Sequence, residues 1–137
     1  PLRLANGEDQ VAQALAWAKA LIEQGPVLIY GSAEPDTVKL AQQKLGVEAA
    51  GQIVEDALSA VAVGLYEMGV RKLVVAGGET SGAVVKALAV KALRIGAMID
   101  PGVPWTLGLR DDPVALALKS GNFGTVDFFE KALANAP

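Results

Sequence analysis

The sequence predicts an α/β domain in which helices are layered on both faces of a largely parallel sheet. Segments with helical periodicity alternate with short apolar runs, and this order is typical of parallel strands joined by helices. The apolar runs lack alternating polar positions, as expected of strands that are buried on both faces. With 137 residues, of which 52% are hydrophobic, the chain is long enough to bury the core of one domain. We therefore expect residues 1–137 to form a single domain.

The first half of the chain predicts three helices and one strand. Apolar residues recur at helical spacing over residues 8–24, which indicates an amphipathic helix. Pro35 starts a shorter helix that ends at Gly46, and residues 47–68 follow as a long amphipathic helix. Between the first two helices, Val27–Tyr30 is a continuous apolar run. We expect this run to be a strand that is buried on both faces.

The second half predicts three strands and two helices. The strands are the apolar runs Lys72–Ala76, Ala92–Ile99 and Val114–Lys119. Helical spacing predicts one helix that carries Val84 and Leu88 and a second over residues 127–134. We expect Asp100-Pro101-Gly102 to be a turn. For Trp105, which follows it, packing within the protein is the favoured interpretation, and an aromatic face presented to a base or to another domain is the alternative.

The composition excludes several functional classes. The chain has no cysteine and no histidine, which removes disulfides, zinc fingers and histidine-dependent catalysis, so that only oxygen-ligand metals such as magnesium remain open. The net charge is −3 and only 5% of the residues are aromatic. The chain therefore offers neither the basic surface nor the stacking platform that nucleic-acid binding requires.

No membrane segment or export signal is expected. Charged residues interrupt the apolar region 83–99, which is shorter than the ~18 uninterrupted apolar residues of a spanning helix. The N-terminus has no basic region that leads into an apolar run. We therefore expect a cytoplasmic protein, and the missing initiator methionine suggests a fragment of a longer one.

Two glycine-containing bends are candidates for ligand binding. The first, Gly77-Gly78-Glu79-Thr80, joins a predicted strand to a helix, where backbone N–H groups and the helix dipole attract anions. It matches neither the Walker A pattern nor the spaced glycines of dinucleotide folds. The alternative is an ordinary connection in which Thr80 or Ser81 caps the helix.

The second bend, Lys119-Ser120-Gly121-Asn122, also follows a predicted strand. If the two strands are parallel, both bends lie at the carboxyl edge of the sheet, where ligands of α/β domains bind. The alternative is a simple loop in which Lys119 is solvated and Gly121 supplies a positive φ.

Four motifs in order resemble the C-terminal nucleotide-binding domain of the four-carbon acid sugar kinases. They occupy residues 27–33, 74–84, 99–105 and 115–124. The resemblance implies ATP-dependent phosphorylation of tetronates such as threonate, erythronate or 3-oxo-tetronate, with ATP bound here and the sugar acid held by an N-terminal domain. It further implies that the nucleotide contacts the first bend and the loop around Gly121 and Asn122, and that Mg²⁺ arrives with the ATP. Lys119 would offset phosphate charge.

The chain lacks two features of that family, namely the N-terminal domain and the Ser-Gly-Ser-Cys-Ser type loop before the nucleotide domain. No general base is identifiable, so the catalytic residues remain unassigned. Because phosphoryl transfer depends on positioning both substrates, the isolated chain should bind nucleotide without catalysing transfer. One alternative is a non-catalytic assembly module that packs on a partner domain or a second copy. Another is an enzyme for a different phosphorylated ligand, such as a sugar phosphate.

Overall fold

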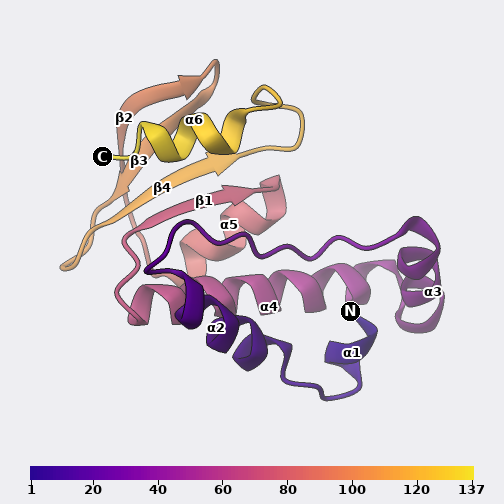
Figure 1. The fold of residues 1–137 in the computed structure, drawn as a ribbon. Coiled ribbons are helices and arrows are strands. Elements are labelled where there is room, and N and C mark those ends of the chain that lie inside the picture. The colour runs from indigo at the N-terminus through magenta and orange to yellow at the C-terminus, as the bar shows by residue number, and fades with distance from the viewer.

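A four-stranded sheet lies in the C-terminal half of the molecule, with helices on both of its faces (Figure 1). The computed structural model describes residues 1–137. The strands are β1 (Lys72–Ala76), β2 (Leu93–Asp100), β3 (Val103–Gly108) and β4 (Val114–Lys119). The helices are α1 (Leu2–Ala5), α2 (Gln10–Leu21), α3 (Pro35–Leu45), α4 (Val47–Glu67), α5 (Gly78–Ala87) and α6 (Phe128–Ala134). Helices α2 to α6 confirm those expected from the sequence, whereas α1 was not predicted.

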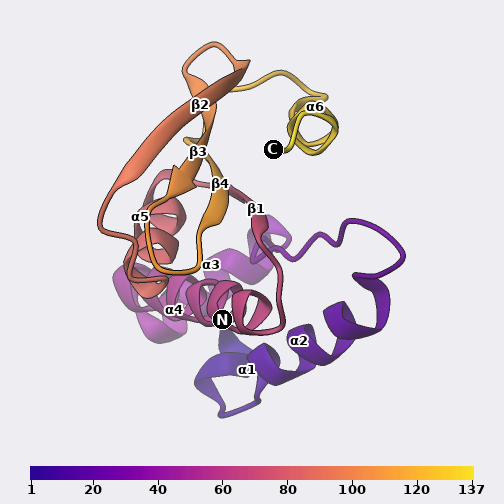
Figure 2. The same ribbon diagram turned by 90° about the vertical axis from the view of Figure 1, so that its left-hand side faces the viewer.

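The sheet separates two apolar cores, and Figure 2 shows α5 and α6 on its opposite sides. On one face, Leu116 packs with Val84 of α5 and with α4. On the other face, Trp105 packs with Phe128 of α6. Helix α2 lies outside α4 and joins it through a smaller cluster around Ala18. This layered arrangement confirms the α/β class. None of the helices combines the length and hydropathy needed to cross a bilayer.

The strand order is β1-β4-β3-β2, and three of the four strands run in the same direction. Strand β1 pairs in parallel with β4, whereas β3 is antiparallel to both of its neighbours. The expectation of a largely parallel sheet is therefore confirmed for the direction of the strands. It needs correction for their pairing, because only the β1–β4 pair is parallel. The physical reason is that the short connections on either side of β3 are hairpins, which join only antiparallel strands.

The predicted strand Val27–Tyr30 was wrong. The segment runs past the sheet as an extended chain without joining any ladder. Val27 and Ile29 pack against the cluster shared by α2 and α4, whereas Leu28 and Tyr30 are 61% and 71% exposed. A short apolar run forms a strand only where another strand offers backbone partners, and β1 leaves its outer edge unpaired here.

The predicted turn at Asp100-Pro101-Gly102 is confirmed, since Pro101 and Gly102 form the turn between β2 and β3. Strand β3 after this turn was not predicted. Proline in a central strand normally argues against a strand, but Pro104 lies opposite Met98, where the β2–β3 register is irregular. The predicted packing of Trp105 is confirmed. Its indole is 2% exposed, and its Nε1–H donates to the carbonyl oxygen of Ala132 at 3.0 Å.

The difference in burial between β4 and the segment Val27–Tyr30 can be tested. Leu116 is fully buried in β4, so Leu116→Ala should lower the free energy of unfolding by about 3 kcal/mol through lost burial and a residual cavity. Leu28→Ala removes the same atoms from an exposed side chain and should change this free energy by less than about 0.5 kcal/mol. Urea denaturation of both variants measures the difference. A comparable loss in both would mean that Val27–Tyr30 is a buried strand after all.

Candidate functional site

The parallel pairing of β1 and β4 brings the two glycine-containing bends together. Ala76 and Lys119 are register partners at the ends of these strands, and the Gly77 N–H donates to the Lys119 carbonyl oxygen at 2.7 Å. A Cβ built on Gly78 would lie 3.6 Å from Ser120 Oγ. The bends therefore meet at one edge of the sheet, as the sequence led us to expect. Their role in binding stays a prediction.

Helix α5 begins at the first bend without a side-chain cap. Gly77 is its N-cap with φ +122°, and no side chain accepts a hydrogen bond from the first turn. The Ser81 hydroxyl instead faces the Val75 carbonyl oxygen at 3.5 Å. The alternative in which Thr80 or Ser81 caps the helix is therefore not observed. The first N–H groups of a helix have no intrahelical acceptor, so this end of α5 can donate to an anion.

Lys119 folds back onto its own bend. Its ammonium donates to the carbonyl oxygens of Ser120 and Gly121 at 3.3 and 3.0 Å. Residues 120–122, including Asn122, are exposed at this edge. Lys119 therefore brings positive charge to the second bend while also bracing its backbone.

The glycines at 78 and 121 are not required by packing within the protein. Nothing lies within 4 Å of a Cβ built on Gly121, and the nearest atom to one built on Gly78 is at ordinary contact distance. Gly121 also lacks a positive φ, which Gly124 has instead at +86°. The alternative role for Gly121 as a source of positive φ is therefore wrong. Gly121 leaves open space at the edge where the bends meet, and the space at Gly78 is bounded by the Ser120 hydroxyl.

Two carboxylates approach each other beside this edge. Burial raises the pKa of Glu55 on α4 above its ordinary value, and the neighbouring carboxylate of Glu79 in the first turn of α5 raises it further. The structure contains no group of three or more acidic side chains arranged to hold a metal ion.

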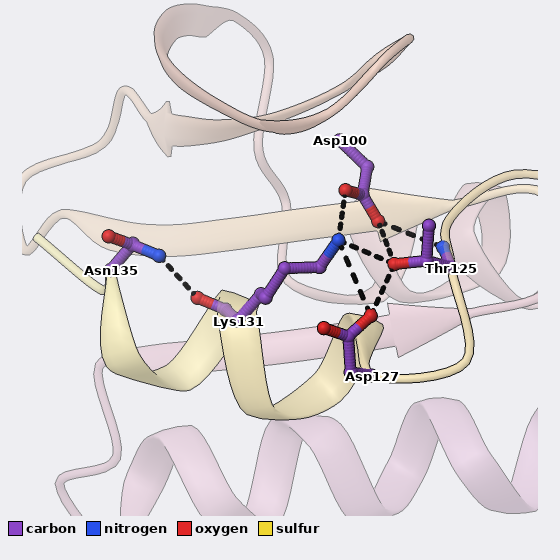
Figure 3. Close-up of polar contacts among 5 residues, drawn as sticks. All are labelled: Asp100, Thr125, Asp127, Lys131 and Asn135. Carbon is purple, nitrogen blue, oxygen red and sulfur yellow. Dashed lines mark hydrogen bonds and ion pairs between the residues drawn. The ribbon is translucent and has the colours of Figure 1, made fainter.

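A second polar cluster, which we call the Asp100 network, lies at the exit of the second bend and comprises Asp100, Thr125, Asp127 and Lys131 (Figure 3). The Asp100 carboxylate accepts a hydrogen bond from the Thr125 N–H at 2.9 Å. The Thr125 hydroxyl lies 3.1 Å from Asp100 and closer still to Asp127, so it shares its one proton between the two carboxylates. Lys131 of α6 donates to the other carboxylate oxygen of Asp100 and to the Thr125 hydroxyl. Sequence reasoning missed this network because its members are 25 and 31 positions apart, with no local pattern to connect them.

A cavity lies away from both bends. It has a volume of about 360 Å³ and is bounded by α1, α2, α4 and the chain that follows Ile29. Its lining is mainly apolar, and it contains none of the eight residues predicted as the nucleotide site.

Comparison with known proteins places the chain among nucleotide-binding domains. A family described as "Nucleotide-binding C-terminal domain" matches residues 1–129. Proteins named 3-oxo-tetronate kinase from Burkholderia multivorans and Pseudomonas fluorescens are 64% and 61% identical to 97% of this chain. The chain covers only 31% and 30% of those proteins, so it spans about a third of the length of the curated relatives it matches.

Solved structures agree with this placement. The crystal structure of Haemophilus influenzae protein HI1011 has a TM-score of 0.84 and 37% identity, covering 93% of this chain and 31% of that one. A structure from Salmonella typhimurium LT2 has a TM-score of 0.78 and 41% identity over 92% of this chain and 31% of that one. In both, the similarity again involves about a third of the longer protein.

The Asp100 network predicts a pH dependence of stability. Hydrogen bonds from the Lys131 ammonium and from the Thr125 N–H lower the pKa of the Asp100 carboxyl. A group whose folded pKa is lowered stabilises the fold above its unfolded pKa of about 4, and that contribution is lost as the pH falls through the folded pKa. Asp100→Asn should therefore flatten the decline in the free energy of unfolding below about pH 4.

Urea denaturation between pH 2 and 6 measures this slope. A residual slope is expected in the variant, because Arg71 lowers the pKa of Asp112 and the Thr125 hydroxyl lowers that of Asp127. If the free energy of unfolding fell as steeply below pH 4 in Asp100→Asn as in the wild type, Asp100 would not be a source of this pH dependence.

Proposed function

Because this chain belongs to the family of nucleotide-binding C-terminal domains, we propose that its two adjacent bends bind ATP. The proposed contacts are Gly77, Gly78, Glu79 and Thr80 in the first bend and Lys119, Ser120, Gly121 and Asn122 in the second. The observation that carries the proposal is the uncapped start of α5 directly beside the second bend. An anion placed there would receive N–H groups from a helix end and lie close to a lysine.

The electrostatics of this edge favour phosphate. The N-terminus of a helix carries roughly half a positive charge, and α5 is ten residues long. The Lys119 ammonium, held on the second bend, adds a full positive charge nearby. The lack of a side chain at Gly78 and Gly121 would let phosphate oxygens approach the backbone closely, which a side chain at either position would prevent.

We propose that Mg²⁺ enters this site with the nucleotide. Mg²⁺ in kinases binds through one or two carboxylates, water and the substrate phosphates rather than through a cage of protein ligands. The donor set of this edge fits that pattern, because Glu79 is an exposed carboxylate in the first turn of α5. Such an ion would neutralise phosphate charge, and Glu79 would be its protein ligand.

For the longer protein we propose phosphorylation of a four-carbon sugar acid such as 3-oxo-tetronate. The proposal derives from the relatives of that name, which share 64% and 61% identity with this chain over its matched length. The chain corresponds to less than a third of those proteins, so an N-terminal domain would hold the sugar acid and the catalytic base. In the cell, ATP and that domain would be the partners of this chain.

A second candidate role, assembly, is favoured by the apolar side chains that remain exposed. Leu28 and Tyr30 project from the extended segment, and Ile95 and Met98 are 73% and 61% exposed on the outer strand β2. Patches of this kind commonly mark surfaces that meet another domain. Sedimentation of the chain with and without ATP separates the roles, because self-association without any nucleotide binding would favour the assembly module.

The nucleotide site is tested by placing side chains in its open space. Gly78→Val and Gly121→Val should each weaken Mg-ATP binding at least tenfold, about 1.4 kcal/mol, by obstructing the approach of phosphate to the backbone. Isothermal titration calorimetry on this chain measures the dissociation constants. Circular dichroism should show that both variants fold, since neither side chain meets a close neighbour in the protein.

Gly82→Val is the matched control. Gly82 lies in the second turn of α5 with nothing within 4 Å of its Cβ position, so Gly82→Val adds the same side chain to the same helix without crowding a neighbour. Mg-ATP binding to Gly82→Val should equal that of the wild type. Unchanged binding in both site variants would defeat the proposed site.

The division of labour between domains gives a separate prediction. Incubated with ATP and 3-oxo-tetronate, this chain alone should form no phosphorylated product, because one half of a two-substrate site cannot align the reacting groups. The full-length protein should form the product under the same conditions, as measured by ADP release in a coupled assay. Turnover by the isolated chain would show that its own residues complete the active site.

A further inference from the structure

The second bend has few anchors of its own. Residues 120–127 are all exposed, and the backbone hydrogen bonds of this stretch are local, from Phe123 N–H to the Ser120 carbonyl and from Phe128 N–H to the Thr125 carbonyl. The β4 ladder fixes the start of the bend at Lys119. Something else must fix its exit if the bend is to keep one shape.

The Asp100 network supplies this second anchor. Asp100 is the last residue of β2 and is only 7% exposed, and it pairs with Val103 in the β2–β3 ladder. Its carboxylate therefore has a rigid position from which it accepts the hydrogen bond of the Thr125 N–H and shares the Thr125 hydroxyl proton with Asp127 (Figure 3). Because β2 and β4 run in the same direction, Asp100 lies at the same edge of the sheet as the two bends.

Lys131 completes the charge balance of this anchor. Its ammonium bonds to Asp100 and to the Thr125 hydroxyl, and it lies 3.5 Å from an Asp127 oxygen. Asp100 raises the pKa of Lys131 in return. These contacts occupy the donors of Lys131, so it serves the network rather than offering a free cation to a ligand.

A contact independent of the network links the same bend to the same hairpin. The Phe123 ring lies against Gly102 of the β2–β3 turn, so closely that a Cβ at Gly102 would be 2.8 Å from the ring. Gly102 also has φ +81°, a conformation that favours glycine. The β2–β3 hairpin therefore holds the loop after β4 at two points, Phe123 and Thr125.

We propose that Asp100, Thr125 and Lys131 are positioning residues that hold the Lys119–Asn122 bend in the shape that binds nucleotide. This inference rests on the proposed function and deepens it. The three residues act without touching the nucleotide, because they keep the bend ordered before the ligand arrives. A bend that must first become ordered binds its ligand more weakly, since the ordering cost is subtracted from the affinity.

Thr125 offers a matched pair of variants. Thr125→Val keeps the side-chain shape and the backbone N–H but removes the hydroxyl that bridges Asp100 and Lys131, whereas Thr125→Ser keeps the hydroxyl. By titration calorimetry on this chain, Thr125→Val should weaken Mg-ATP binding about tenfold through lost preorganisation. Thr125→Ser should stay within about twofold of the wild type. Asp100→Asn provides a second variant if Thr125→Val does not fold.

The control for general destabilisation is an ion pair at the opposite edge of the sheet. Arg71 precedes β1 and pairs with Asp112 of the β3–β4 connection. Asp112→Asn should lower the melting temperature while leaving Mg-ATP affinity within about twofold of the wild type. Equal losses of affinity in Asp112→Asn and Thr125→Val would overturn the positioning role, as would unchanged affinity in Thr125→Val.

Hydrogen exchange without nucleotide separates this inference from the proposed function. Thr125→Val should speed exchange of the amides at positions 123 and 125, which are hydrogen-bonded in the wild type, and Asp112→Asn should not. Equal exchange over these residues in Thr125→Val and the wild type would refute the anchoring itself. Absence of Mg-ATP binding to the wild-type chain would instead refute the proposed function, whatever the exchange rates.

Discussion

The parallel pairing of β1 with β4 is the constraint on which the candidate site depends. Parallel strands end at the same edge of a sheet, so the bends after Ala76 and Lys119 have to meet. The pairing is buried on both faces, by α4 and α5 on one side and by α6 on the other. Because Leu116 and its neighbours in β4 contribute to both cores, loss of packing on either face would move the second bend relative to the start of α5.

The β2–β3 hairpin gives that edge its second constraint. Strand β3 lies beside β4 and carries Trp105 into the core under α6, while the turn before it brings Asp100 and Gly102 to the loop that leads into α6. Packing below the edge and polar contacts at the edge thus come from one hairpin. The conformation of the loop between β4 and α6 therefore depends on contacts with β2 and with the β2–β3 turn.

Local patterns in the sequence predicted most elements and the family, but they failed where a partner decides the conformation. The motifs that suggested the acid sugar kinase family are confirmed by relatives that match 97% of the chain. Val27–Tyr30 has the composition of a strand, yet it finds no ladder here. Val103–Gly108 was not predicted as a strand, and the irregular register opposite Met98 accommodates its Pro104. A strand forms only beside another strand, and the local sequence does not show which strand that will be.

The sequence by itself determined helices α2 to α6, the α/β class and the two glycine-containing bends, because helical periodicity and glycine turns depend on residues close together in the chain. Only the tertiary structure decided that α5 starts without a cap, that Lys119 folds onto its own bend, and that Asp100 reaches Thr125 and Lys131. These contacts join residues from separate elements, and their geometry exists only once the sheet has been assembled. The sequence predicts what depends on residues close together in the chain. Contacts between residues far apart in the chain depend on how the helices and strands pack, so only the structure shows them.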